Sequence, residues 1–428
     1  MLLHTYTRRQ TLQLLGTGAL GAMLASCSSS SAKEFVILSI ADPNQNKPLI
    51  QAIEAAHPGV KLVWRQLTSE TFTELFTAAS VAGDQIDLVD LNGQDLHRYA
   101  VDHSLMDLSN LAYKGRFHPI GLQAFTISKK LWALPRGGIS GFTFFYNKKL
   151  LAQIGMTREP QTYDDLKMLA SKLNKIGVPL FIHPGQDIYL WPVWYFWAYA
   201  QTTNNQSDEY TFQTLAGNKK FTDPESVEAL EIIARFAQDN LFIPSTNSLT
   251  STAAWLLFTQ GKGAFYYSHT SSIGTYRQGN FPMLDMSLIA PVLAVSNTAV
   301  KRQMPGGTGN ALAMYHKIDP SRTQLGYSIM NLMTSDKWVK WTNTLNGDPV
   351  SCNTNVQASS DPIALKYNKE CAPNQIIYLD WYWPPEITNA FQQNIQGIVA
   401  GMIKPAEAAR SIQQMMDQLR REGYTFQS

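Results

Sequence analysis

Short apolar runs alternate with amphipathic stretches along the first part of the chain. Residues 35–40 read FVILSI, an apolar run of the kind that forms a buried strand. Apolar residues at helical spacing follow in 49–56, and two strand-like stretches, 60–64 and 86–91, enclose a second helical pattern. This β-α-β-α-β order predicts a mainly parallel sheet that is covered by helices.

The same alternation returns in the second part of the chain. Residues 142–146 read FTFFY and residues 178–182 read VPLFI, and both stretches predict strands. Residues 162–173 between them carry an apolar stripe at helical spacing, and Ile412 and Leu419 mark a late amphipathic helix. Because the roughly 400 residues after the N-terminal segment exceed one ordinary core, we expect two α/β lobes.

An uncharged run precedes the first predicted strand. The run from Thr11 to Ala25 follows the pair Arg8 and Arg9, and it is shorter than the about 20 residues that a membrane-spanning helix needs. This order is typical of a secretory signal peptide, and TRRQTL around the arginine pair also resembles a twin-arginine export signal. No later stretch has 18 consecutive apolar residues, so we expect the remainder to be water-soluble.

Residues 24–27 read LASC and resemble the lipobox of bacterial lipoproteins. The resemblance implies a signal peptide over 1–26, lipid on Cys27, and a serine-rich tether over 27–34. It places the protein outside the cytoplasm, in the periplasm or on the outer face of the cytoplasmic membrane. An ordinary signal peptide with an incidental Cys27 is the alternative.

Composition and motifs exclude several classes of function. The formal net charge is +2 and charged residues make up 16% of the chain, below the usual ~25%. Basic residues form no long run, so we expect no nucleic-acid partner. The eight histidines lack metal-ligand spacing, and no nucleophile elbow, HExxH motif or P-loop occurs. We therefore expect no metal, no cofactor and no enzymatic activity.

Four short motifs, in this order, resemble the extracellular solute-binding proteins of ABC importers, specifically the family-one, sugar-binding type. They are FFYNKKLL at 144–151, FTQGKGAF at 258–265, PGGTGNAL at 305–312 and KPAEAA at 404–409. The resemblance implies a periplasmic-binding-protein type II fold, with two α/β lobes, a hinge and a ligand cleft between the lobes. It implies these boundaries: lobe I over 35–140 plus 285–346, and lobe II over 141–284 plus 347–428.

The same resemblance implies a function. We expect a monomer that binds a sugar or a small glycoside by closing its lobes and delivers the ligand, unaltered, to the membrane subunits of an ABC importer. Two alternatives stay open. One is the same fold with a non-sugar solute, such as a polyamine or a metal complex. The other is an exported glycoside hydrolase, which needs two carboxylates that flank the scissile bond.

Polar side chains follow the predicted strands of lobe I. Ligands of open α/β sheets lie beyond the carboxyl ends of the strands, and amides and carboxylates offer a polyol both donors and acceptors. The candidates are Asn44, Gln45, Gln66, Asp90, Asn92 and Gln94. The alternative is that they form turns and helix caps. Arg136, just before the first crossing, bridges ligand hydroxyls, pairs with an acid of lobe I, or is a solvated arginine of the hinge.

Aromatic residues form two clusters in lobe II, YLWPVWYFWAY at 189–199 and LDWYWPPE at 379–386. Aromatic rings pack in cores and also stack on sugars, and we predict that at least one of these tryptophans stacks on the ligand. Prolines within both clusters argue against regular core helices. The lobe II candidates are Tyr189, Trp191, Ser271, Trp381 and Trp383, and two further candidates are Gly306 and Gly307, which the expected boundaries assign to lobe I.

Ser271 marks a departure from the family pattern, which commonly has tryptophan at this place. The departure implies a smaller or more polar cleft, suited to a monosaccharide, a disaccharide or a small glycoside. Apart from Cys27, the chain has Cys352 and Cys371. In an oxidising compartment we expect these two to form a disulfide, which would stabilise the fold by about 3 kcal/mol. Two separately buried thiols are the alternative.

Overall fold

The computed structural model describes residues 33–68, 71–156, 158–279, 281, 284–287, 304–424 and 426. The predicted signal peptide over 1–26, the lipidated Cys27 and most of the tether over 27–34 therefore lie outside the described residues. Among the helices that the structure describes, none combines the length and the apolar character that a membrane span requires.

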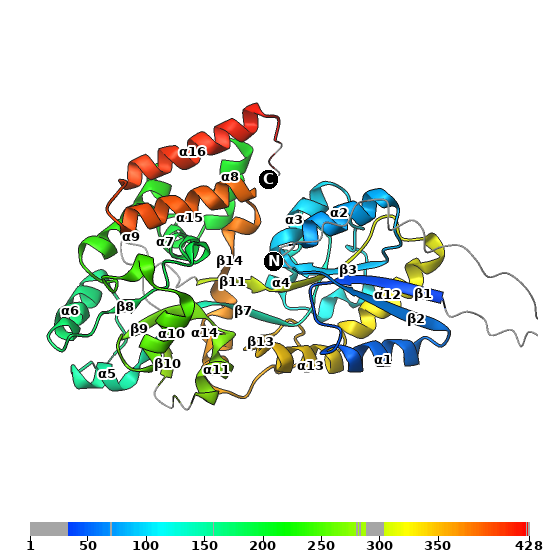
Figure 1. Ribbon diagram of the computed structural model, residues 1–428, viewed down its shortest axis with the longest axis horizontal. Coiled ribbons are helices and arrows are strands. Elements are labelled where there is room, and N and C mark those ends of the chain that lie inside the picture. The colour runs from blue at the N-terminus through cyan, green and yellow to red at the C-terminus, as the bar shows by residue number, and fades with distance from the viewer. Residues whose placement is uncertain are drawn as a thin grey trace, which may run out of the picture.

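Lobe I is built on a five-stranded sheet with the order β2-β1-β3-β12-β6 (Figure 1). Its strands are β1 (Lys33–Ser39), β2 (Val60–Gln66), β3 (Leu88–Asn92), β6 (Leu134–Pro135) and β12 (Asn310–Met314). Strands β1, β2 and β3 are parallel, and β12 runs antiparallel to both of its neighbours. The apolar run of β1 is buried on both faces, as a parallel sheet between helices requires.

Helices cover both faces of this sheet, and a small hairpin closes one side. These elements are α1 (Lys47–Ala56), α2 (Phe72–Ala82), α3 (Gly93–Val101), η1 (Ala112–Arg116), α4 (Pro119–Ala124), β4 (Thr126–Ile127), β5 (Lys130–Leu131), α12 (Pro320–Met333) and α13 (Asp336–Asn346). In α1, Leu49 and Ile53 fall on one face at helical spacing, and both side chains are fully buried.

Lobe II is built on a mixed seven-stranded sheet. Its strands are β7 (Gly138–Asn147), β8 (Phe181–Ile182), β9 (Phe265–His269), β10 (Leu284–Ser287), β11 (Met304–Thr308), β13 (Val350–Ser351) and β14 (Gln375–Ile377). The main path is β14-β11-β7-β9-β8, and both β10 and β13 pair with β7. Strand β7 is therefore the centre of the lobe II sheet.

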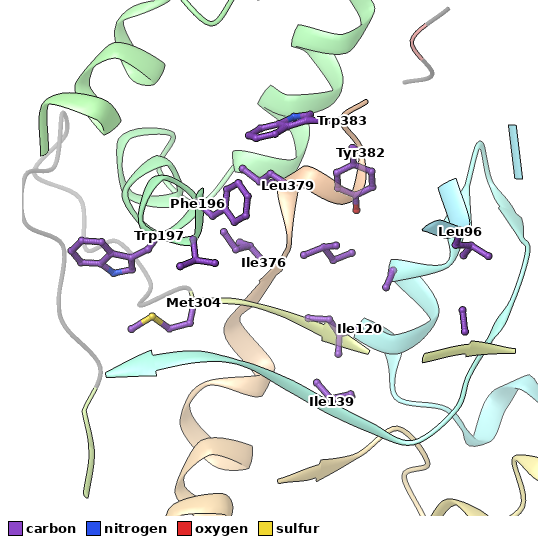
Figure 2. Packing of buried hydrophobic residues seen from close by; sticks show 14 of the residues in the cluster. Leu96, Ile120, Ile139, Phe196, Trp197, Met304, Ile376, Leu379, Tyr382 and Trp383 are labelled. Atoms are coloured by element: carbon purple, nitrogen blue, oxygen red, sulfur yellow. The ribbon is translucent and has the colours of Figure 1, made fainter. Parts of the chain in front are cut away.

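The helices of lobe II surround one helix that is apolar on every side, α7 (Pro192–Thr202). The others are α5 (Lys148–Gln153), α6 (Tyr163–Asn174), η2 (Ile188–Leu190), α8 (Ser207–Ala216), α9 (Pro224–Gln238), η3 (Thr246–Ser248), α10 (Ser251–Thr259), α11 (Ser272–Gln278), α14 (Pro362–Glu370), η4 (Ala372–Asn374), η5 (Leu379–Trp381), α15 (Pro385–Val399) and α16 (Pro405–Arg421). Phe196 of α7 lies edge-on to Trp383, with ring centroids 5.5 Å apart (Figure 2). A helix that is apolar all round belongs in a core.

The chain crosses between the lobes three times, and β7 and β11 lie between the two bodies (Figure 1). The first crossing is at 136–137, between β6 and β7, and the third is near 348–353, before and within β13. The second crossing is at Gly309, because β11 pairs with β7 while β12 pairs with β3. We expected lobe I to resume at residue 285. That boundary is wrong, since β10 pairs antiparallel with β7 in lobe II.

The expected disulfide is also wrong, because Cys352 and Cys371 are two buried thiols. Cys352 lies at the third crossing, where its Sγ is 3.5 Å from the carbonyl oxygen of Pro135. Cys371 lies at the C-terminal end of α14, so the two side chains belong to different elements. Burial raises the pKa of both thiols well above the ordinary value.

Burial of these thiols makes them unreactive in the folded protein. With Cys27 replaced by serine, we expect no reaction with a thiol reagent in the native state, because little thiolate forms and reagent cannot enter. Two thiols per chain should react after denaturation without reductant. Spectrophotometric thiol titration measures both numbers. If the denatured protein has no reactive thiol, Cys352 and Cys371 form the disulfide that we first expected.

Asp348 packs directly against the backbone of the first crossing. A Cβ added at Gly138 would lie 2.1 Å from the Cβ of Asp348, and the neighbouring Gly137 has a φ of +108°. Asn346 Nδ2 donates a hydrogen bond to Asp348 Oδ2 over 3.3 Å. Burial raises the pKa of the Asp348 carboxyl to about 7. A titratable acid therefore lies where the lobes are joined.

The pKa of Asp348 makes the free energy of unfolding depend on pH. Since the folded-state pKa lies above the unfolded value of 3.8, its contribution is fully present below about pH 4 and is lost as pH rises toward 7. We expect Asp348→Asn to remove this loss, up to about 4 kcal/mol. Urea unfolding from pH 4 to 8 should show a growing advantage of the variant over wild type. The exposed-acid control is Asp84→Asn. If the difference in unfolding free energy between Asp348→Asn and wild type were independent of pH and equal to that of the control, the raised pKa of Asp348 would be contradicted.

Candidate functional site

The two lobes touch at the ends of their strands. A Cβ added at Gly93, which follows β3, would lie 2.8 Å from the ring of Trp381 in η5. A Cβ added at Gly347 would lie 3.7 Å from the carbonyl oxygen of Ser271, which follows β9. We call this region the lobe boundary. It lies at the carboxyl ends of β3, β9 and β14, the edge at which open α/β sheets bind ligands.

On the lobe I side, Asp90 and Arg136 form a buried ion pair. Their side chains are 0% and 2% exposed. Ser39 Oγ donates to Asp90 Oδ2 over 2.6 Å, and Arg136 Nη2 donates to Asn46 Oδ1 over 2.6 Å. Of the three roles left open for Arg136, pairing with a lobe I acid is the one observed, and its burial rules out a solvated arginine. Both charges therefore lie in the interior of lobe I, where they stabilise the end of this lobe that faces the lobe boundary.

The remaining lobe I candidates lie at the same edge of the sheet. Asn44 is an exposed turn residue, and its N–H donates to Asp42 Oδ1 over 2.8 Å. Gln45 and Gln66 are exposed, and Asn92 is partly exposed opposite Asn310. Gln94 lies in α3, and its side chain is outside the described part of the structure. The strand ends thus bring polar groups together, and the loop before α1 uses Asn44 as a turn former.

On the lobe II side, four partly exposed aromatic rings follow one another along the lobe boundary. His269, Phe142, Tyr378 and Trp381 have successive ring centroids 5.5, 6.2 and 5.3 Å apart. We call these four residues the aromatic strip. They come from β9, β7, the end of β14 and η5, and Phe142 and His269 are opposite each other in the register of β7 and β9.

Gly306 and Gly307 of β11 make room for this arrangement. A Cβ at Gly307 would lie 3.1 Å from the Trp381 ring, and a Cβ at Gly306 would lie 2.1 Å from Gln375 Nε2. The two predicted glycines therefore allow side chains to approach the β11 backbone. Ser271 is exposed, and its Oγ is 2.7 Å from His269 Nδ1. Next to Ser271, the aromatic ring at the lobe boundary is that of His269.

A cavity of about 420 Å³ opens next to the aromatic strip, sharing Phe142 and His269 with it. Its other aromatic walls are Tyr189, Trp255, Tyr266 and Tyr267. Its aliphatic hydroxyl groups come from Ser251, Thr252, Ser268, Ser272 and Thr275. Burial lowers the pKa of His269 to about 4, so its imidazole is neutral near pH 7. The cavity offers aromatic faces and neutral hydrogen-bonding groups.

Two polar atoms next to the strip lack partners. Within the described residues, neither Tyr378 Oη nor Asp380 Oδ1 has a hydrogen-bond partner, and both atoms are buried. Burial raises the pKa of Asp380 to about 7. Burial, and then the nearby Asp380 charge, also raise the pKa of Tyr378. Among the described residues, no group of three or more His, Cys, Asp and Glu side chains could hold a metal ion.

Trp191 and Trp383 are corrections to the predicted site. Trp191 is 0% exposed, and its Nε1 donates to the Gly185 carbonyl oxygen over 3.1 Å. Trp383 is 6% exposed and stacks on Phe391, with ring centroids 4.3 Å apart. Both rings belong to the lobe II core, because the prolines of the two clusters begin helices α7 and α15 instead of interrupting them. Trp381 is the predicted tryptophan with a ring at the lobe boundary.

Sequence reasoning missed four residues of this region: Phe142, His269, Tyr378 and Asp380. Tyr378 and Asp380 are adjacent to the predicted Trp381, and they follow an apolar strand, as the lobe I candidates do. The rule that ligands lie beyond the carboxyl ends of strands would have identified Tyr378 and Asp380 if it had also been applied to lobe II. Phe142 carried no such signal, because its place depends on its register with β9.

Two α/β lobes, three crossings and a ring-lined lobe boundary at strand ends define a two-lobed solute-binding protein of the periplasmic-binding-protein type II class. The chain belongs to the family described as bacterial extracellular solute-binding protein, whose model matches residues 48–370. The predicted fold class and family are confirmed. The family consists of binding proteins, which confirms the prediction that the chain is not an enzyme.

Relatives in sequence and in structure agree with this assignment. Binding proteins of Brucella abortus and Brucella suis are 25% identical over 219 residues. The match covers 50% of this chain and 51% of each relative, so the chain spans about half the length of these relatives.

Solved structures share the fold over most of the chain. A family 1 extracellular solute-binding protein from Bifidobacterium longum subsp. infantis has a TM-score of 0.78 at 14% identity, covering 91% of this chain and 100% of that one. A chitin oligosaccharide binding protein gives 0.72 at 16%, covering 91% and 99%. RafE in complex with raffinose gives 0.68 at 15%, covering 90% and 99%. At such identities, the similarity establishes the fold.

The contact between Gly93 and Trp381 can be tested by adding one methyl group. Gly93→Ala would place Cβ 2.8 Å from the ring, so we expect the lobes to separate at a cost of about 1–3 kcal/mol. Solution scattering should give a larger radius of gyration, and the double variant with Trp381→Ala should recover part of the change, because the added Cβ also lies 2.9 Å from the carbonyl oxygen of Thr308. Gly115→Ala, where a Cβ meets nothing within 4 Å, is the matched control. A wild-type scattering curve for Gly93→Ala would refute the contact.

Proposed function

We propose that this protein binds a sugar or a small glycoside at the lobe boundary and delivers it, unaltered, to an ABC importer. The aromatic strip is the observation that carries the proposal. Its four rings are partly exposed between the lobes, next to a cavity lined by five serine and threonine side chains. Aromatic faces cover the apolar C–H faces of sugar rings, while hydroxyl groups pair with the ring substituents.

The size of the cavity favours a small ligand. Its volume of about 420 Å³ is at the lower end of the roughly 300–1,000 Å³ common for small-molecule sites. This agrees with the monosaccharide, disaccharide or small glycoside expected from Ser271. The strip extends beyond the cavity to Trp381, where a second ring of the ligand would lie.

Two of the similar structures support a saccharide ligand by name. One is described as a chitin oligosaccharide binding protein, and another was solved with raffinose. We extend the class of ligand, but neither particular sugar, to this chain.

The mechanism is closure of the two lobes around the ligand. A ligand that contacts lobe II through the strip and lobe I through the strand ends is bound best in the closed state, so it shifts the population toward closure. The three crossings are the segments about which the lobes turn. The closed complex is the form that the membrane subunits of the importer recognise.

The location follows from the N-terminal motif. In this proposal Cys27 carries lipid, and residues 27–34 tether a monomeric binding protein to the outer face of the cytoplasmic membrane. Anchoring keeps the ligand-loaded protein close to its transporter, and it raises their effective concentration.

Binding can be tested on a panel of mono- and disaccharides by thermal shift, followed by calorimetry on those that raise the melting temperature. We expect Trp381→Ala and Phe142→Ala each to weaken binding about tenfold, since a stacked ring contributes about 1.5 kcal/mol. Trp341→Ala, on α13 of lobe I, is the control and should leave affinity unchanged. If no saccharide stabilises the protein, or if the control weakens binding equally, the proposal fails.

A further inference from the structure

Asp380 lies at the lobe boundary and forms no ion pair with any residue that the structure describes. Within the described chain its Oδ1 has no hydrogen-bond partner, and no lysine or arginine lowers its pKa. By contrast, Asp90 of β3 pairs with Arg136 and accepts a hydrogen bond from Ser39. A carboxylate oxygen that is buried without a hydrogen-bond partner is unfavourable, so its place beside the binding region requires an explanation.

Aromatic rings flank this acid. Asp380 stands between Tyr378 and Trp381 in the chain, and the two rings are 5.3 Å apart at an angle of 45°. Both rings are partly exposed, and the Tyr378 hydroxyl also lacks a partner in the described structure. Trp381 reaches lobe I at Gly93. We call Tyr378, Asp380 and Trp381 the acid–aromatic group.

All three side chains of the acid–aromatic group attract a cation. An aromatic face attracts a cation within about 6 Å of the ring centroid, and the attraction grows when the cation is desolvated. A carboxylate attracts the same cation and loses its own desolvation penalty by pairing with it. A sugar hydroxyl would satisfy the hydrogen bond of Asp380 but leave its charge uncompensated.

We propose that the acid–aromatic group selects a saccharide with a protonated amino group, which pairs with Asp380 against the rings of Tyr378 and Trp381. The inference rests on the proposed function, because it assigns the amino group to a ligand held by the aromatic strip. The ligand class is an amino sugar or an aminated glycoside. The rings of the strip hold the sugar body, and Asp380 distinguishes the amine from a hydroxyl or an acetamide.

The test compares ligands that differ at one substituent. Glucosamine and its β-1,4-linked dimer, their N-acetylated forms, and glucose and cellobiose are titrated into the full-length protein by calorimetry at pH 7. We expect the amine to bind at least tenfold more tightly than its N-acetyl and hydroxyl counterparts. Asp380→Asn, which keeps the shape and removes the charge, should reduce this ratio to about one.

Controls separate this inference from the proposed function. Asp84→Asn, an exposed acid of lobe I, should keep the wild-type ratio, and unfolding of Asp380→Asn without ligand checks that it folds. Equal binding of amine and hydroxyl by the wild type, or an equal loss for all ligands in Asp380→Asn, overturns the inference and leaves saccharide binding standing. If no saccharide binds but spermidine does, the proposed function fails, and with it the amino-sugar class.

Discussion

The buried ion pair between Arg136 and Asp90 fixes where lobe I ends and the crossings begin. The Arg136 side chain joins β3 through Asp90 and the loop before α1 through Asn46. Its backbone N–H donates to the Asn310 carbonyl oxygen over 3.0 Å, which ties the first crossing to the strand that follows the second. Removing one partner of such a pair destabilises a protein by about 3–5 kcal/mol. The pair therefore sets the positions from which both segments leave lobe I.

At the lobe boundary, glycines allow side chains to lie directly against the backbone of the crossings. Trp381 rests on Gly307, which belongs to the second crossing, and it meets Gly93 at the start of α3. Asp348 likewise rests on Gly138, at the start of β7. Because these side chains lie against backbone, strand geometry determines their positions more than rotamer choice does. A rotation at the crossings thus changes the distance between Trp381 and lobe I directly, and the hinge and the aromatic strip form one mechanical unit.

Local patterns predicted what depends on local sequence. The apolar runs gave the parallel strands of lobe I, and the rule of strand ends gave Asp90, Gln66 and Asn92 at the correct edge. Pairing between distant segments has no local signal, so the β10–β7 pair was missed and Asp285–Ser287 was assigned to the wrong lobe. Proline misled in a different way: Pro192 and Pro385 begin helices, which buries Trp191 and Trp383 in the core.

The aromatic rings and the cavity-lining residues are distributed unequally between the two lobes, and this affects how the lobes close. All four rings of the aromatic strip, and every residue that lines the adjacent cavity, belong to lobe II. In the proposed binding mode, a ligand makes most of its contacts before the lobes close, so lobe II would supply affinity in the open state. Lobe I adds only the contacts made at Asn92, Gly93 and the neighbouring strand ends. Since a ligand shifts an equilibrium by no more than its differential affinity for the two states, the few lobe I contacts set how completely the protein closes.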